Sequence, residues 1–285
     1  MKFTKMHGVG NDYVFVDCFS ERTPSNPHGL AVEISDRHRG IGADGLILIE
    51  PSDRGDARVR MYGSDGNEAI ACSNGVRCVA KYLFDHKRCT KTKMRIETDG
   101  ELLDVNVFAS SEIAQLMKVD MGPPILDAAG IPTELPGDPV FDNQVVDVPM
   151  EIEGLPLTVT CVSLGHPHCV VFVEQLHDEL VHQLGPIVDS SEAFPYGANV
   201  EFVEVVSRTS IRQRTWMRGG GEVLANATSA GAACVAGVLT GRTDRSIACQ
   251  LAGGLLQLEW DNFTNHVHMT GPAVEVFSGR WNGLS

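Results

Sequence analysis

The chain has 285 residues, of which 43% are hydrophobic and 21% charged, a composition that fits two globular domains of ordinary size and excludes extensive disorder. Its formal net charge is -14, and no run of lysine or arginine interrupts the excess of acidic residues. Because phosphate binding needs a basic face, this charge excludes nucleic acid as the expected partner and leaves a small-molecule substrate.

The N-terminal stretch, MKFTKMHGVGNDYVFVD at residues 1–17, predicts a strand. Its apolar and polar residues alternate, and it lacks the unbroken apolar core of a secretory signal. No later stretch reaches the ~20 apolar residues of a membrane-spanning helix. We therefore expect a cytoplasmic protein with no membrane partner.

Further strands and two helix starts follow in chain order. GADGLILIE at 42–50 predicts a strand, and the small polar cluster CSNG at 72–75 precedes an apolar periodic run, which predicts a helix start. The Pro- and Gly-rich segment at 125–139 predicts a crossing between two halves of the chain. GANVEFVEV at 197–205 then repeats the strand signal, and NATS at 226–229 repeats the helix start.

The two halves follow one plan at a nearly constant offset. Glu68 and Glu222 are 222 − 68 = 154 residues apart, and the same offset relates Arg58 to Arg212, Arg60 to Arg214, Tyr62 to Trp216 and Ala71 to Ala225. With one residue of slippage, GNDYVFVD near residue 10 matches GHPHCVVFV near residue 165. Agreement at several separated places predicts that one α/β unit is duplicated within the chain.

Both predicted helix starts are candidate anion sites. The first turn of a helix leaves backbone N–H groups unpaired and carries the positive end of the helix dipole. Two such turns facing one cleft would hold one carboxylate between them. The same environment favours a thiolate at Cys72, although a small cap residue explains Cys72 equally well. The second turn carries Asn226 in the equivalent place.

The residues predict neither a structural metal nor a bound nucleotide. The eight cysteines, at 18, 72, 78, 89, 161, 169, 234 and 249, are scattered without CxxC pairs, so we expect no disulfide and no structural metal. The glycines at 219–221 lack both the GxGxxG spacing and a P-loop lysine, which discounts nucleotide binding.

Six segments together resemble the diaminopimelate epimerase family, collinearly over nearly the whole chain. They are KMHGVGNDYVFVD (5–17), DRHRGIGADGLILIE (36–50), DGNEAIACSNGVRCVAKYL (65–83), SLGHPHCVVFV (163–173), GANVEFVEVV (197–206) and RGGGEVLANATSAGAACVAGVL (218–239). The resemblance implies an α/β (α+β) fold of two pseudo-symmetric domains, each a curved sheet around a central helix, that close over the substrate. In this family two cysteines act on opposite faces of the α-carbon without pyridoxal phosphate or metal.

The resemblance also implies domain limits and an assembly. The closing strand VEVFSGRW at 274–281 returns to the first domain in this family, which gives a first domain of 1–122 with 272–285 and a second of 123–271. A homodimer is kept open as the assembly.

The resemblance assigns site residues one by one. Cys72 corresponds to the first catalytic cysteine and His168 to its histidine partner. Substrate-binding positions are matched by Asn11, Asn199, Arg218, by Asn74 and Gly75 in the first turn, and by Thr228 and Ser229 in or next to the second. On the residues alone, Asn11 can instead cap a turn, His168 can be a satisfied strand histidine, and Arg218 can be solvated.

Six site positions depart from the family pattern. Asn226 replaces the second catalytic cysteine, Met217 replaces the glutamate that assists it, Gly63 and His166 replace asparagines that hold the distal end of diaminopimelate, and Ser73 and Ala227 replace glycines of the turns. Because an amide does not ionise near neutral pH, Asn226 cannot serve as a general base.

Three functions are compatible with this pattern. We favour a cofactor-independent isomerase or epimerase in which Cys72 and His168 abstract a proton next to a carboxylate, with Asn226 or a water it holds on the far face. Its substrate would be an amino acid or related acid other than diaminopimelate, so conversion of LL- to meso-diaminopimelate would be slow. The alternatives are an ordinary diaminopimelate epimerase of lysine biosynthesis and a non-catalytic amino-acid-binding homologue.

Overall fold

A computed structural model describes residues 1–69, 73–99 and 101–283 of the chain. The chain divides into two compact units, Met1–Asp120 with Thr270–Ser285, and Met121–Met269. Each unit combines a sheet with few helices, so the expected α+β class is confirmed. The predicted limits, 1–122 with 272–285 and 123–271, differ from the edges of these units by two residues. The division into two domains at these limits stays a prediction.

The first unit contains nine strands and two helices among its described residues. Strand β1 pairs antiparallel with β18 and β2, β2 runs parallel to β3, and β3 pairs antiparallel with β4. Strand β4 pairs antiparallel with the short β5 and parallel with β6, and β7 pairs antiparallel with both β6 and β8. The elements are β1 (Lys2–Gly8), β2 (Asn11–Asp17), α1 (Pro27–Ser35), β3 (Gly45–Glu50), β4 (Ala57–Gly63), β5 (Glu68–Ala69), α2 (Ser73–Asp85), β6 (Lys93–Glu97), β7 (Leu102–Ser110), β8 (Ile113–Asp120) and β18 (Val274–Arg280).

The second unit repeats this series of pairings. Strand β10 pairs antiparallel with β9 and β11, β11 runs parallel to β12, and β12 pairs antiparallel with β13. Strand β13 pairs with the short β14 and runs parallel to β15, which pairs antiparallel with β16. The elements are η1 (Ala128–Gly130), η2 (Pro139–Phe141), β9 (Val148–Ile152), β10 (Leu155–Ser163), β11 (Pro167–Val173), η3 (Leu180–Leu184), α3 (Gly185–Asp189), β12 (Asn199–Ser207), β13 (Ser210–Met217), β14 (Gly221–Val223), α4 (Ala227–Leu239), β15 (Ser246–Leu251), β16 (Gly254–Trp260) and β17 (Val267–Gly271).

Strand register places the sequence repeat in the structure. Tyr62 pairs with Glu68 across β4 and β5, and Trp216 pairs with Glu222 across β13 and β14. Both pairs are related by the offset of 154 that the sequence predicts. The two helices that follow the predicted turns begin at Ser73 and Ala227, which are also 227 − 73 = 154 residues apart. The duplication therefore extends to hydrogen-bonded register within each unit.

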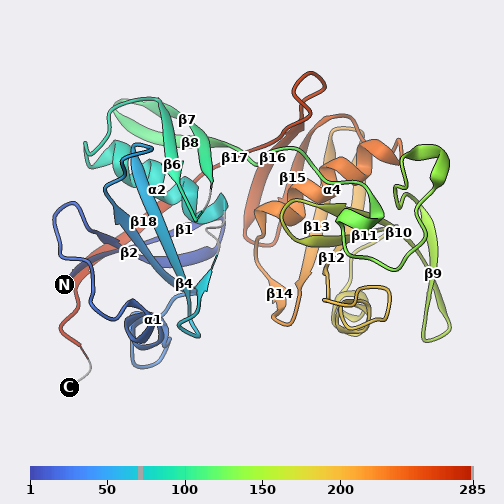
Figure 1. Ribbon diagram of the computed structural model, residues 1–285, viewed down its shortest axis with the longest axis horizontal. Coiled ribbons are helices and arrows are strands. Elements are labelled where there is room, and N and C mark those ends of the chain that lie inside the picture. Colours follow the sequence, from blue (N-terminus) through green and yellow to red (C-terminus); the bar gives the residue numbers. More distant parts are fainter. Residues whose placement is uncertain (70–72, 100, 284–285) are drawn as a thin grey trace. The chain divides into compact units, whose positions relative to one another are not determined.

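Each unit has a long helix that packs against its own sheet (Figure 1). Helix α2 packs against β8, β1 and β7, and helix α4 packs against β16, β10 and β11. Small residues let α4 approach closely, since a Cβ added at Gly237 would lie 2.2 Å from the Thr243 hydroxyl. The N-terminal turn of each helix, which carries the candidate site residues, is buried with it.

The opposite face of each sheet is covered by shorter helical segments. In the first unit α1 packs on β3 and β4, where Val14, Ile34 and Leu46 belong to one apolar cluster. In the second unit α3 lies against β12 and β13. Because strand β3 is covered on both faces, its sequence GLILIE reads as a nearly continuous apolar run rather than strict alternation. The equivalent strand β12 is interrupted by Asn199, Glu201 and Glu204.

Replacement of Gly185 by alanine is expected to destabilise the second unit by about 1–3 kcal/mol, because the new methyl group overpacks the core. A Cβ at this first residue of α3 would lie 2.7 Å from Cγ of the Trp216 indole. Urea unfolding should show a lower midpoint with an unchanged slope. Gly220→Ala is the matched control, since its Cβ would lie 3.5 Å from the nearest atom. Equal midpoints for the two variants would contradict this prediction.

Candidate functional site

In the first unit, Asn11 is held at both ends of its amide. Its Nδ2 donates to Asp44 Oδ2 at 2.8 Å, and its Oδ1 accepts from Asn74 Nδ2 at 3.2 Å. Asn11 begins β2 and Asn74 lies in the first turn of α2, so these contacts join the two elements. The structure therefore brings together two predicted substrate-binding residues that are 63 positions apart in sequence.

Sequence reasoning missed Asp44, whose carboxylate accepts hydrogen bonds from several residues around Asn11. Besides Asn11, it accepts the backbone N–H of Asp12 at 3.0 Å and a hydrogen bond from Arg37 Nη2 at 2.9 Å. Burial raises the pKa of the Asp44 carboxyl above its ordinary value. The signal in the sequence was the acidic residue just before the apolar strand LILIE.

The remaining predicted residues of the first unit lie at the end of β4 and the start of α2. Gly63 ends β4, where its N–H donates to the carbonyl oxygen of Asn67 at 2.9 Å. Ser73 and Gly75 are buried in the first turn of α2. Cys72, the predicted catalytic cysteine, lies outside the described residues. The Oδ1 atom of Asn74 is buried and has no hydrogen-bond partner in the part of the chain that the structure describes.

In the second unit, His168 forms a buried pair with Glu201. His168 Nδ1 lies 2.9 Å from Glu201 Oε1, and both side chains are 0% exposed. The other polar atom of each group, His168 Nε2 and Glu201 Oε2, is buried without a hydrogen-bond partner among the described residues. The sequence predicted His168 but not Glu201, whose only signal was a charged residue inside the apolar strand NVEFVEVV.

His166, Asn199 and Arg218 are also brought together in the second unit. Asn199 Oδ1 accepts the backbone N–H of Arg218 at 3.0 Å, and the Arg218 guanidinium donates from Nη1 to the Tyr196 carbonyl oxygen at 3.2 Å. Burial, followed by the nearby charges of His168 and Arg218, lowers the pKa of His166. His166 is therefore held as a neutral imidazole at neutral pH, which can donate or accept a hydrogen bond.

Asn226 caps helix α4. Its Oδ1 accepts the backbone N–H of Ser229 at 3.1 Å and the Thr228 hydroxyl at 2.8 Å, and its Nδ2 lies 2.8 Å from the sulfur of Met217. The residues at positions 217 and 226 thus touch, as an acid/base residue and its assistant would. Ala227 is buried directly after the cap.

Each unit has an equivalent bidentate Arg–Glu ion pair at the short strand that precedes its long helix, and we call this pair the brace. In the second unit Arg214 binds Glu222 through Nε at 2.7 Å and Nη2 at 2.8 Å, and His182 Nε2 lies 2.8 Å from Glu222 Oε2. This bidentate contact raises the pKa of Arg214 and lowers that of Glu222. In the first unit Arg60 binds Glu68 in the same bidentate way, at 2.8 and 3.2 Å.

In each unit a histidine that sequence reasoning missed lies next to the brace. His28 lies edge-on to Tyr62 with ring centroids 5.1 Å apart, and His182 lies edge-on to Trp216 at 6.5 Å. The two histidines are 182 − 28 = 154 residues apart, so extending the repeat toward the N-terminus would have found them. These residues fix the short strands β5 and β14, from which the chain enters each helix turn.

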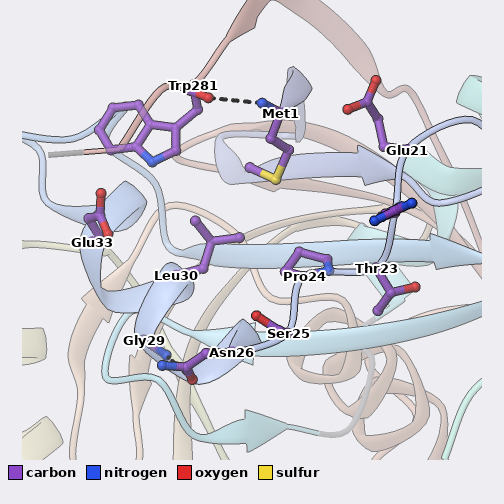
Figure 2. A pocket seen from close by; sticks show the side chains of 11 residues that line it. Met1, Glu21, Thr23, Pro24, Ser25, Asn26, Gly29, Leu30, Glu33 and Trp281 are labelled. Carbon is purple, nitrogen blue, oxygen red and sulfur yellow. Dashed lines mark hydrogen bonds between the residues drawn. The ribbon is translucent and has the colours of Figure 1, made fainter.

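A hollow of about 830 Å³ lies elsewhere in the first unit, between residues 21–33 and the residues Met1 and Trp281. Figure 2 shows its lining, with the Met1 ammonium donating to the Trp281 carbonyl oxygen at 3.0 Å. The lining contains none of the predicted site residues that the structure describes. Among the residues at 1–69, 73–99 and 101–283, no group of three or more His, Cys, Asp or Glu is placed to hold a metal ion. Over the same residues, no helix has both the length and the apolar character needed to cross a membrane.

Alkylation at pH 7–8 is expected to modify Cys72 before any other thiol, because the described cysteines are buried or have unreactive thiols. Cys78, Cys161, Cys169, Cys234 and Cys249 are buried. Burial raises the pKa of the half-buried Cys18 to about 11 and also raises the pKa of Cys89.

Labelling of Cys18 should therefore rise about tenfold per pH unit up to its pKa, since only the thiolate reacts. Peptide mapping after brief iodoacetamide treatment measures the order of modification. First modification at Cys18 or Cys89 at neutral pH would contradict the prediction.

The comparisons with known proteins agree with this geometry. The solved structure of a hydroxyproline epimerase from Agrobacterium vitis matches 98% of this chain and 90% of its own, with a TM-score of 0.69 at 14% identity, which shows an epimerase-type fold. The family model "Diaminopimelate epimerase" matches residues 3–126 and 160–276. The diaminopimelate epimerase of Acetivibrio thermocellus is 46% identical over 279 residues, 98% of each chain. That of Desulfovibrio desulfuricans is 44% identical over 283 residues, 99% of this chain and 98% of its own. The chain belongs to the diaminopimelate epimerase family.

These relatives contradict one expectation from the sequence. We had expected a substrate other than diaminopimelate, and slow conversion of LL- to meso-diaminopimelate, because of the changes at Asn226, Met217, Gly63 and His166. Proteins that are 43–46% identical over nearly the full length are named diaminopimelate epimerase, which favours the ordinary alternative. The expectation was wrong because it gave four changed side chains more weight than the rest of the site and fold.

Proposed function

We propose that this protein is an ordinary diaminopimelate epimerase that interconverts LL- and meso-diaminopimelate. The observation that carries the proposal is the full-length 46% identity to a protein of that name. The site residues support it, since the first unit supplies Asn11 and Asn74 and the second supplies His168, Asn199 and Arg218. A cytoplasmic location and a homodimer are part of the same proposal.

The first proton transfer is assigned to Cys72 and His168. The thiolate takes the α-proton, so that an S–H bond forms and the electron pair of the broken C–H bond stays on the substrate next to its carboxylate. The N-terminal turns of α2 and α4 are assigned to the carboxylate, because their N–H groups and dipoles stabilise the negative charge that builds there. These turns contain Ser73, Asn74 and Gly75 of α2 and Ala227, Thr228 and Ser229 of α4.

The second proton transfer cannot use the Asn226 side chain as acid or base, because an amide has no ionisation near neutral pH. We assign this step to a water held at Asn226. Its O–H bond breaks as a C–H bond forms on the face opposite Cys72, and the hydroxide left behind takes a proton from solvent. The contacts of Asn226 with Thr228 and Met217 hold the amide in one orientation, as binding of an ordered water would require. His166 and Gly63 are assigned to the distal end of the substrate.

Proton NMR of LL-diaminopimelate in D2O with the purified protein tests this function. We expect loss of the α-proton signal together with formation of the meso isomer, and a coupled enzymatic assay for the meso isomer gives the rate. Cys89→Ser is the matched control, because it removes a half-buried thiol of the first unit and should retain activity. Absence of both exchange and interconversion, with the protein folded, would overturn the proposal.

A further inference from the structure

The pair of His168 and Glu201 differs in character from its counterpart in the first unit. Parallel pairing places His168 beside Asn199 in β11 and β12, and Tyr13 beside Gly45 in β2 and β3. Two residues further along the same face, Val170 pairs with Glu201 where Phe15 pairs with Ile47. Glu201 therefore occupies the position that Ile47 holds in the first unit, and both side chains are 0% exposed.

The difference extends across the neighbouring strand. Glu201 pairs with Thr215 and Val203 with Gln213, whereas Ile47 pairs with Met61 and Ile49 with Val59. Four buried positions on this face are therefore polar in the second unit and apolar or aromatic in the first. They are His168, Glu201, Thr215 and Gln213 in the second unit, and Tyr13, Ile47, Met61 and Val59 in the first. The first unit folds with the same pairings without the ionisable pair. The fold alone therefore does not require a buried carboxylate at position 201.

Burying a carboxylate and an imidazole is costly unless each satisfies the other. Here one hydrogen bond of 2.9 Å is formed, and Nε2 of the imidazole is buried with no partner in the described parts of the chain. A carboxylate at Nδ1 selects the tautomer that carries its proton on Nδ1. The lone pair then lies on Nε2, on the side of the ring away from Glu201.

The ionisable groups around the pair are few. His166 is the neighbouring histidine, whose pKa is lowered by burial, and Cys169 lies next to His168 on β11 and interacts with Glu201. Cys161 is the only ionisable residue of β10, and Cys234 is the only one of helix α4. Strand β13 contributes Arg212 and Arg214, which are bound to Glu204 and Glu222. Glu201 is therefore the acidic group placed to balance a charge on His168.

We propose that Glu201 is a positioning residue that holds His168 in the Nδ1–H tautomer, so that Nε2 can take the proton of the Cys72 thiol. In this step the S–H bond breaks and its electron pair stays on sulfur, an Nε2–H bond forms, and the Glu201 carboxylate balances the imidazolium. The inference rests on the proposed function, because it assigns a role within the same catalytic site.

Two substitutions of Glu201 separate its hydrogen bond from its charge. Gln at position 201 can accept the Nδ1–H bond through its carbonyl oxygen but carries no charge, whereas Ile, the residue of the first unit, supplies neither. We expect Glu201→Ile to lower kcat about 10- to 100-fold, by analogy with the loss that follows removal of the partner that orients a metal-binding histidine, with KM within about threefold of the original. The kcat of Glu201→Gln should lie between those of the original protein and Glu201→Ile. The matched control is Gln213→Val, which makes the same face apolar without touching His168 and should retain kcat.

The tautomer and the thiol reaction provide readouts that do not depend on turnover. Nitrogen-15 NMR of the histidine side chains should show the Nδ1–H tautomer for His168 in the original protein and in Glu201→Gln, and lose it in Glu201→Ile. The pH at which Cys72 becomes reactive toward iodoacetamide should move upward in both variants, because the imidazolium is no longer balanced.

The outcomes distinguish this inference from the proposed function. An unchanged tautomer and an unchanged pH profile of alkylation in both variants would overturn the role of Glu201, whatever the protein turns over. If Glu201 had only a structural role, its replacement would lower the unfolding temperature but leave the pH profile of alkylation unchanged. That result would also overturn the positioning role of Glu201. Altered tautomer and profile in a protein without diaminopimelate turnover would support Glu201 and overturn only the substrate.

Discussion

Replacement of Cys72 by alanine is expected to lower the rate of diaminopimelate epimerisation by about 10²- to 10⁴-fold, the usual loss when a positioned acid/base group is removed. Asn226 cannot take over, because its amide does not ionise near neutral pH and is engaged in capping α4. Only solvent would then remain to abstract the α-proton. Exchange of that proton in D2O should fall by the same factor as interconversion, since both begin with the same bond breaking.

Two comparisons make this prediction specific. Cys72→Ala should leave substrate binding nearly intact, because the contacts of Asn11, Asn74 and Arg218 are unaffected, so KM should change little while kcat falls. Cys89→Ser should retain activity. Loss of activity in Cys89→Ser, or an active Cys72→Ala protein, would contradict the assignment of the base.

Replacement of His168 by alanine is expected to destabilise the second unit by about 3–5 kcal/mol, because it leaves the fully buried Glu201 carboxylate without its partner. For a unit of this size the loss corresponds to a fall of roughly 6–20 °C in unfolding temperature. Differential scanning calorimetry of the original protein and the variant measures the fall.

A double substitution identifies the cause of that loss. Adding Glu201→Ile to His168→Ala removes the unpaired carboxylate and restores the apolar residue that the first unit has at Ile47. More than half of the lost stability should return, while activity stays low because the histidine is absent. Equal stability of the single and double variants would show that the loss came from the cavity alone and would contradict the argument from the buried charge.

Catalysis with Asn226 at the second cysteine position is the main mechanistic question that family membership raises. The relatives show that the chain belongs with diaminopimelate epimerases despite this change. Within the second unit, Asn226 replaces a reactive thiol by a helix cap whose oxygen is already shared by Ser229 and Thr228. Under the proposed function, the step on this face is assigned to water rather than to a side chain, and a water proton would exchange freely with solvent.

The sequence by itself determined the features that depend on local pattern. The repeat at an offset of 154, the helix starts after residues 72 and 226, the α+β class and the family all follow from turn residues, periodicity and motifs. Register confirmed the repeat at Tyr62 and Trp216, because a one-residue slip would move every side chain of a strand to the other face. Helix starts are readable because capping involves residues only three positions apart.

Only the tertiary structure decided which distant side chains meet. Glu201 lies 33 residues from His168, and Asp44 lies 33 residues from Asn11, so no local pattern joins either pair. In the sequence, Glu201 is only one polar residue of a predicted strand. Its burial against His168 arises because β11 runs parallel beside β12 and α4 covers the same face. Asn226 likewise reads as a lost cysteine in sequence, while the structure gives its amide three contacts. The physical reason is that propensity and periodicity act over a few residues, whereas a buried polar group must be satisfied by whatever the fold places next to it.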